Sequence, residues 1–319
     1  MIRKEYHTNN TIKRIYEVDD EGLRHGVFEE YYPNGRPCIE TSYKDGAIEG
    51  AYTKFYENGN KMLVASYEKG LLNGKYEKYY QIGAIEIKTV YKKGDMDGYY
   101  ERYFENGRME VRTSYKQGMK HGGYKKYHEN SNTQIDCSYK LGELHGGYEE
   151  FYENKVKKLK TSYKDGMLHG SYKEFHENGK VSVIVDYRND KREGAYVKYF
   201  EDGKICIQAT YKDGQFSGKY EKSHSSGTLF VKSFYKDGKL DGSYEDYLFD
   251  GALHISANYN NGSLDGDYVE YHINKKLRIK TSYKNGNLDG DYEKYHDNGV
   301  LDVKTVYRDG VNINIIENV

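Results

Sequence analysis

Histidine is the residue of this chain best suited to binding a metal, and it recurs at a fixed spacing. His121, His145 and His169 are 24 residues apart, and His25 occupies the same place in an earlier repeat. Zinc needs converging ligand atoms near 2 Å. If a repeat consists of two strands, equivalent positions are roughly 9–10 Å apart, at about 4.8 Å per strand. We therefore interpret these histidines as solvated turn residues and predict no metal site.

A second set of histidines occupies another fixed position of the repeat. Elsewhere this position holds tyrosine, at Tyr32, Tyr56, Tyr80 and Tyr152. Both side chains combine an apolar ring with a polar tip, so we interpret the histidines as substitutes for tyrosine. A pH-sensitive stripe is the alternative. The histidines are His128, His176, His224, His272 and His296.

A basic residue follows the recurring tyrosine of the repeat in ten of twelve cases. Such a row could bind the phosphates of lipid head groups or of nucleic acid. Alternatively, it is a solvated turn position offset by acids such as Asp45, Asp165, Asp213, Asp237 and Asp309, which the net charge of −1 favours. The basic residues are Lys44, Lys92, Lys116, Lys140, Lys164, Arg188, Lys212, Lys236, Lys284 and Arg308.

Acidic residues also recur in register, as at Asp97, Asp241, Asp265 and Asp289. No acid differs from its copies in a way that indicates a catalytic pair, and no serine, threonine or cysteine nucleophile is set apart with a base. The glycine-rich turns lack the strand-to-helix context of a phosphate loop. The sequence therefore predicts no catalytic, cofactor-binding or metal-binding residues, no cofactor and no enzyme.

The elements that carry these residues repeat every 24 residues, without an insertion, from Tyr43 to Tyr307. The recurring phrase is Tyr-Lys-Asp-Gly-x-Leu-x-Gly-x-Tyr. A strict period of this size is typical of repeat proteins, in which each repeat packs only against its neighbours.

One repeat reads as a β-hairpin. An aromatic run, 99–104, meets Glu105-Asn106-Gly107, which suits a type I turn followed by a left-handed glycine. The second run alternates with period two, as a half-buried strand does. It places Met109, Val111, Thr113 and Tyr115 on one face and Glu110 and Arg112 on the other.

Fixed columns of side chains accompany this pattern. The residue four before the repeat tyrosine is always aliphatic, and the residue two before it is always small, as Ile207 and Ala209 illustrate. We expect these columns to stack as ladders with the aliphatic side chains buried. Tyr100 and Tyr103 leave two alternatives open: a bulge brings both to one face, or both faces carry aromatic residues.

Gly118 and Gly122 connect one hairpin to the next, and we expect a longer turn that needs positive φ twice. The hairpin glycine is lost at Ser131, Lys155 and Lys275, and the first connecting glycine at Asp190. These residues tolerate the left-handed region poorly, so looser hairpins are expected there.

The composition favours a folded chain without a large core. Mean hydropathy is −0.99 and 31% of the residues are charged, but the 38 tyrosines can pack with their hydroxyls in water. Cys38, Cys137 and Cys206 lie in different repeats, so we expect free thiols. The residues from Met1 to His7 lack the apolar core of a signal peptide, and no apolar run approaches the roughly 18 residues of a membrane helix. A soluble cytoplasmic protein is expected.

The predicted fold class is all-β: an elongated, single-layer antiparallel β-meander built from tandem 24-residue hairpin repeats. Residues 1–25 are expected to form a degenerate N-terminal capping repeat. Twelve repeats should fill residues 26–310, and residues 311–319 should form an incomplete C-terminal cap strand.

The repeat resembles the MORN family, in its variant form. The segments that carry the resemblance most fully are Gly50 to Gly59 and Tyr67 to Gly74, and it covers about residues 20 to 310. The chain departs from the better-studied MORN repeat in lacking tryptophan and in its repeat length of 24. The resemblance implies a repeat scaffold, and in some members contact with phospholipid.

Three functions compete. The leading hypothesis is a scaffold that binds a protein partner through a tyrosine-rich β surface. The second is a peripheral membrane or phosphoinositide-binding module that uses the lysine column. The third is a single-stranded nucleic-acid binder, which the balanced charge disfavours.

Overall fold

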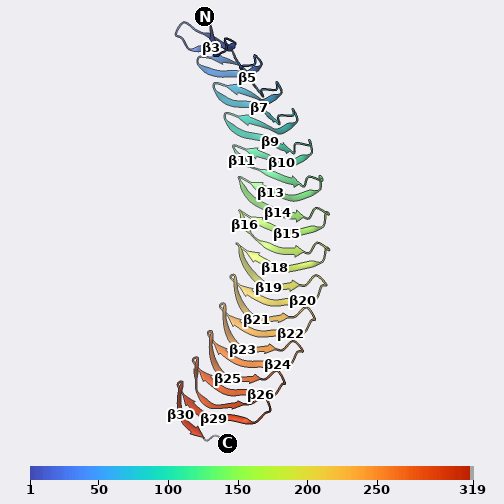
Figure 1. Cartoon of the computed structure of the whole chain (residues 1–319), viewed down its shortest axis with the longest axis vertical. Helices are drawn as coiled ribbons and strands as arrows, with labels where there is room; N and C mark the ends of the chain where they lie inside the picture. The colour runs from blue at the N-terminus through green and yellow to red at the C-terminus, as the bar shows by residue number, and fades with distance from the viewer. Residues whose placement is uncertain (317–319) are drawn as a thin grey trace. The chain divides into compact units, whose positions relative to one another are not determined.

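The computed structural model describes residues 1–316, and these form two compact units. The first comprises Met1–Val156 with Tyr163–Gly166, and the second comprises Lys157–Ser162 with the described chain from Met167 onward. Within each unit, antiparallel strands lie side by side in chain order (Figure 1). Residues 1–316 contain no helix. The predicted class, an all-β antiparallel meander of hairpin repeats, is confirmed.

The strands alternate with short turns, and three of them (β11, β16 and β27) are two-residue pieces separated from the next strand by a single residue. Residues 317–319 of the predicted C-terminal strand lie outside the described residues. The predicted division into caps and repeats stays a prediction. The strands are β1 Ile2–Tyr6, β2 Ile12–Val18, β3 Arg24–Tyr31, β4 Pro37–Lys44, β5 Ala47–Phe55, β6 Lys61–Glu68, β7 Leu71–Tyr79, β8 Ile85–Lys92, β9 Asp95–Tyr103, β10 Met109–Lys116, β11 Met119–Lys120, β12 Gly122–Tyr127, β13 Thr133–Lys140, β14 Glu143–Phe151, β15 Lys157–Lys164, β16 Met167–Leu168, β17 Gly170–Phe175, β18 Val181–Arg188, β19 Lys191–Tyr199, β20 Ile205–Lys212, β21 Gln215–Ser223, β22 Leu229–Lys236, β23 Lys239–Tyr247, β24 Leu253–Asn260, β25 Ser263–Tyr271, β26 Leu277–Lys284, β27 Asn287–Leu288, β28 Gly290–Tyr295, β29 Leu301–Arg308 and β30 Val311–Ile316.

The hairpin turn predicted between β9 and β10 is confirmed. The amide of Gly107 donates to the carbonyl of Phe104 at 2.9 Å, and the amide of Phe104 donates to the carbonyl of Arg108 at 2.8 Å. Gly107 has φ of +80°. These contacts define a turn that ends in a left-handed residue, as in a three-residue hairpin.

A bulge beside this turn corrects the predicted facing of β10. Met109 lies opposite Tyr103 and Val111 opposite Arg102, so Glu110 is the extra residue. The Glu110 carboxylate pairs with Arg102 at 3.0 Å, whereas Arg112 lies opposite Glu101. Glu110 and Arg112 therefore lie on different faces, and Met109 shares the face of Arg112. The prediction that strict alternation runs through Met109 was wrong, because a bulge shifts the side chains by one position.

The same register shows how the aromatic residues of β9 are distributed. Tyr100 lies opposite Thr113, whereas the hydroxyl of Tyr103 donates to Glu101 on the other face at 2.7 Å. Both faces of the sheet therefore carry aromatic residues. The bulge sits on β10 and does not bring the two tyrosines together.

The connection between hairpins is shorter than predicted. Gln117 and Gly118 form a two-residue turn with φ of +50° and +77°, the type I′ geometry. Gly122 belongs to a bulge instead. Tyr115 lies opposite Lys120, and Arg112 lies opposite Lys125. The two residues between Arg112 and Tyr115 on β10 therefore face the four residues 121–124 on the partner side. Positive φ at both glycines was correctly predicted, but one long turn was wrong.

Residues that replace the turn glycines keep the same backbone. Ser131, Lys155, Lys275 and Asp190 have φ between +64° and +69°. The amide of Ser131 donates to the carbonyl of His128 at 2.8 Å, close to the 2.9 Å at Gly107. The expected looser geometry is absent at these positions. The paired strands fix the turn conformation, so the non-glycine residue adopts the strained left-handed backbone.

The most buried column is the small one rather than the aliphatic one. Ala65, Thr89, Val185, Ser233 and Ala257 are at most 2% exposed. Thr89 lies between Tyr76 and Tyr100, which are its cross-strand neighbours on the two flanking strands. Ile207 is only half-buried, so the expectation of a buried aliphatic column was wrong for this residue. In a single layer, nothing but neighbouring side chains can cover a ladder.

Candidate functional site

Two histidines of the first column, His121 and His145, hydrogen-bond to the backbone of the next turn, whereas Nδ1 of His169 is buried without a partner in the described chain. Nδ1 of His121 accepts from the amide of Leu141, and Nδ1 of His145 from the amide of Asp165, each at 3.5 Å. Glu49 and Asp97 do the same for Lys69 at 2.7 Å and Gln117 at 3.2 Å. The recipient is always the first left-handed residue of the two-residue turn. This column holds only side chains that can accept a hydrogen bond, and that restriction was the sequence signal for this role, which the interpretation as solvated turn residues did not include.

These histidines do not converge on a metal. Within residues 1–316, no group of three or more histidine, cysteine, aspartate or glutamate side chains could hold an ion. The interpretation as turn residues is confirmed for His25 and His145, whose side chains are 51% and 40% exposed, with His25 near Asp45 at 3.6 Å and His145 near Asp165 at 3.4 Å.

Histidines of the second column make the hydrogen bond that tyrosine makes at the same position of other repeats. The hydroxyl of Tyr56 donates to the carbonyl of Tyr79 at 2.8 Å. Nε2 of His128 lies 3.1 Å from the carbonyl oxygen of Phe151, and that of His176 lies 3.2 Å from Tyr199. Either ring therefore links a hairpin turn to the last residue of the first strand in the following hairpin, which confirms the interpretation for His128 and His176.

His224 is different from the other histidines of that column. Its Nε2 is buried without a hydrogen-bond partner in the described part of the chain. Its ring packs against two phenylalanines, with centroid distances of 4.8 Å to Phe230 and 5.1 Å to Phe249.

One face of the sheet, here called the tyrosine-pair face, carries paired rings in each repeat. Tyr76 and Tyr91 have centroids 5.4 Å apart, and Tyr148 and Tyr163 are 5.7 Å apart and edge to face. Burial raises the pKa of Tyr148 to about 12. Aromatic pairs of this geometry add stability beyond their buried area, so the rings are fixed in orientation.

The opposite face, here called the tyrosine–glutamate face, pairs several of its tyrosines with a glutamate two residues earlier in the chain. The hydroxyl of Tyr79 donates to Glu77, and that of Tyr247 donates to Glu245, each at 2.6 Å. Burial, followed by the bond to Glu77, raises the pKa of Tyr79 to about 12. Cross-strand ion pairs such as Lys232–Glu245, at 3.2 Å, neutralise part of the charge on this face.

The basic column lies at the two-residue turns and is exposed. Its members occupy the last position of a strand, as Lys116 does in β10 opposite Met119. Arg188 pairs with Glu193 at 3.7 Å. The column therefore presents cations along one edge of each compact unit, spaced by about two strands.

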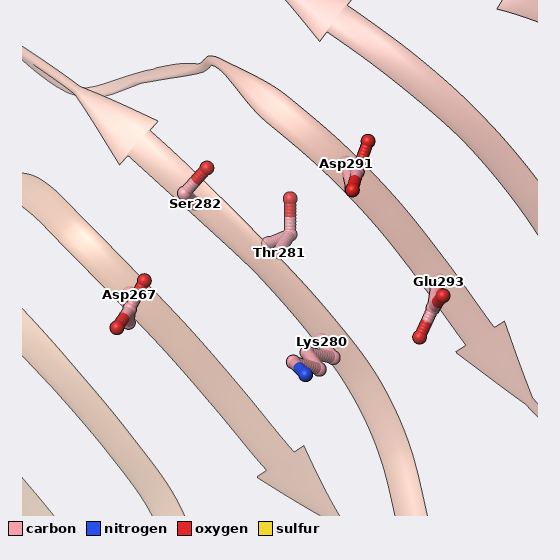
Figure 2. A pocket seen from close by; sticks show the side chains of 6 residues that line it. All are labelled: Asp267, Lys280, Thr281, Ser282, Asp291 and Glu293. Atoms are coloured by element: carbon pink, nitrogen blue, oxygen red, sulfur yellow. The ribbon is translucent and has the colours of Figure 1, made fainter.

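A shallow polar hollow of about 230 Å³ lies on the tyrosine–glutamate face of the second unit (Figure 2). The Ser282 hydroxyl donates to the carbonyl of Asp289, and Glu293 pairs with Lys304 at 2.9 Å. With its serine and one carboxylate already engaged, the hollow does not form a nucleophile–base pair. Its lining residues are Asp267, Lys280, Thr281, Ser282, Asp291 and Glu293.

Together, the hairpins, the repeated turns and the forward hydrogen bonds define a tandem β-hairpin repeat protein. The chain belongs to the MORN repeat family in its variant form. The model of the MORN repeat variant matches residues 24–45, 48–69, 96–117, 168–189, 192–213, 264–285 and 288–309. The resemblance predicted from the sequence is thereby confirmed.

No curated protein matches the chain. Among solved structures, it is similar to a chain of the crystal structure of TcdB2-TccC3, with 11% identity, a TM-score of 0.17, and coverage of 96% of this chain and 22% of that chain. A chain of the Tc holotoxin pore of Photorhabdus luminescens gives 10% identity, a TM-score of 0.16, and 97% and 22% coverage. This chain thus spans about a fifth of those chains, and such scores carry no argument.

No helix in residues 1–316 is long and apolar enough to cross a membrane. Cys38, Cys137 and Cys206 are free thiols, and Cys137 is buried.

Proposed function

We propose that this chain is a non-enzymatic scaffold that binds a protein partner through its repeated tyrosine surface. The observation that carries the proposal is the regular series of fixed ring pairs, from Tyr52–Tyr67 at 5.7 Å to Tyr292–Tyr307 at 5.7 Å. Tyrosine supplies contact area and a hydroxyl at a low entropic cost, and a ring that is already held in place loses little freedom on binding.

Affinity capture with the purified chain, followed by mass spectrometry, tests the proposal. Deleting residues 74–97 removes one whole repeat and keeps the register, since repeat stability is close to a sum of nearest-neighbour terms. We expect the shortened chain to fold and to capture the same protein with a graded loss. Complete loss of capture from one surface substitution, with the fold intact, would contradict a distributed surface.

The exposed basic column supports a second candidate, binding to anionic lipid. Lys116, Lys140 and Lys212 are exposed members of this column. Replacing all three with glutamate should abolish co-sedimentation with phosphatidylserine vesicles if this candidate is correct. We do not propose nucleic acid as a partner, because the net charge of −1 offers no excess of cations.

We also propose that the protein works in the cytoplasm, where free thiols persist. Imaging of a fluorescent fusion tests the location. Accumulation in a secretory compartment would exclude it.

A further inference from the structure

A row of acidic hairpin turns is interrupted in the second compact unit. The residue that opens the turn is acidic in five consecutive repeats, as at Glu177 and Glu201, but it is Ser225, Phe249 and then Ile273 in the next three. The side chains of Phe249 and Ile273 are 72% and 84% exposed. Equivalent positions lie about 9–10 Å apart, so these apolar residues form a continuous row on the turn edge. Exposed apolar groups gathered in this way mark interaction sites.

The row extends onto the tyrosine-pair face through His224. This ring contacts Phe230 and Phe249, and its Nε2 lacks the carbonyl partner that the same atom of His272 has at 2.9 Å. Leaving a buried polar atom unpaired is destabilising. The repeat therefore departs from the common pattern in a way that its own stability does not explain.

Two lysines beside this cluster lack the acidic partner that Lys78 and Lys294 have, as do Lys54 and Lys126, which have Met62 and Gln134 at that place. Lys78 pairs with Glu86 eight residues later at 2.8 Å, and Lys294 pairs with Asp302 at 2.7 Å. The positions eight residues after Lys198 and Lys222 are Cys206 and Phe230.

Both lysines lie on one face, one on each side of Ile207, since each is opposite Ile207 in its own strand pair. The ammonium nitrogen of Lys222 is 5.2 Å from the ring centroid of Phe230. Positive charge and aromatic surface are thus adjacent.

We propose that Lys198, Lys222, Phe230, Phe249 and Ile273, here called the aromatic–lysine patch, bind a peptide segment that carries both carboxylates and apolar side chains. Charge complementarity to the two lysines selects an acidic segment, and the exposed rings and Ile273 select its apolar residues. The acids at the rim are paired with other lysines, Asp202 with Lys204 at 3.4 Å and Asp250 with Lys275 at 2.9 Å, so they do not cancel the charge of Lys198 and Lys222. The inference rests on the proposed scaffold function and adds a place and a chemistry to it.

Fluorescence anisotropy with labelled synthetic peptides tests the patch. Three peptides of equal length alternate glutamate with leucine, lysine with leucine, and glutamate with serine. We expect only the first to bind the wild-type chain well. Phe249→Glu with Ile273→Glu introduces the residue type found in the five turns from Glu105 to Glu201, so circular dichroism should be unchanged, while affinity should fall about tenfold or more. Lys198→Glu with Lys222→Glu should have a similar effect.

The matched control alters two equivalent turns of the first unit, Glu105→Ala with Glu129→Ala, and should leave the affinity unchanged. Equal binding by wild type and both patch variants would overturn the patch and leave the scaffold function standing. Failure of the glutamate–leucine peptide to bind the wild type would also overturn it, as would binding of phosphatidylserine vesicles that the Phe249 and Ile273 substitutions abolish. The scaffold function has its own readout, capture by the repeat-deletion variant.

Discussion

Nε2 of His272 lies 2.9 Å from the carbonyl oxygen of Tyr295, the last residue of the first strand in the following hairpin. In the first unit, the phenolic oxygen of Tyr56 is 2.8 Å from the carbonyl oxygen of Tyr79 at the equivalent place. Two side chains of different chemistry therefore make one and the same link between consecutive repeats.

This link predicts the effect of changing His272. His272→Ala should lower the free energy of unfolding by about 1 kcal/mol, since it leaves a backbone carbonyl without its donor. His272→Tyr should keep wild-type stability, because the hydroxyl replaces Nε2. Urea denaturation of the two variants measures the difference, and equal loss in both would show that the link is unimportant.

The small column should not tolerate larger residues. Ala257 is 2% exposed and lies opposite Tyr244 on one strand and Tyr268 on the other. Ala257→Leu should destabilise the protein by about 1–3 kcal/mol through overpacking. The adjacent Asn258 is exposed, and Asn258→Leu should change stability little. A similar denaturation midpoint for both variants would refute the burial assigned to this column.

Ser131 and Gly107 occupy the same left-handed turn position, with φ of +69° and +80°. Ser131→Gly should stabilise the protein by about 1 kcal/mol, and Gly107→Ser should destabilise it by a similar amount, because only glycine adopts this region without strain. Thermal unfolding followed by circular dichroism measures the two shifts, which should have opposite signs.

Alkaline pH should unfold the protein. Burial and the bond to Glu77 raise the pKa of Tyr79 from 10.0 to about 12, and burial and Glu101 do the same for Tyr103. The unfolded chain loses these protons first, so the stabilisation is complete below pH 10 and is lost as pH rises from 10 to 12. Phenolate absorbance should rise together with unfolding, and a phenolate titration completed near pH 10 with the fold intact would contradict the raised values.

Much of the fold followed from the sequence because the 24-residue period and the turn glycines act locally. The hairpin at Gly107 needed only neighbouring residues for its prediction. The facing of Met109 and Glu110 did not follow, because a bulge has no composition signal of its own and inverts every side chain beyond it. The core of the sheet was misplaced for another reason: in a single layer only neighbouring side chains cover a residue, and the small column is covered better than the aliphatic one.

The contacts between repeats were predictable only in part. The equivalence of histidine and tyrosine at His128 and Tyr56 was visible as a shared column, but the carbonyl that each one meets depends on how the hairpins are staggered. The aromatic–lysine patch could not be predicted from the 24-residue period either. Phe249 and Ile273 differ from the residues at the same position of other repeats, and a pattern built from what the repeats share leaves such exceptions out.

The Glu49 carboxylate accepts from the amide of Lys69, 20 residues ahead, and the Tyr56 hydroxyl donates to the carbonyl of Tyr79, 23 residues ahead, so both side chains bond to a residue nearer the C-terminus. Each hairpin thus offers its successor the same set of contacts that it received from its predecessor. A gene encoding such a chain can gain or lose 24 codons by unequal recombination, and the two new neighbours will already fit one another. Array length is then free to drift or be selected for reach, while a local exception such as Phe249 is copied or lost as a block.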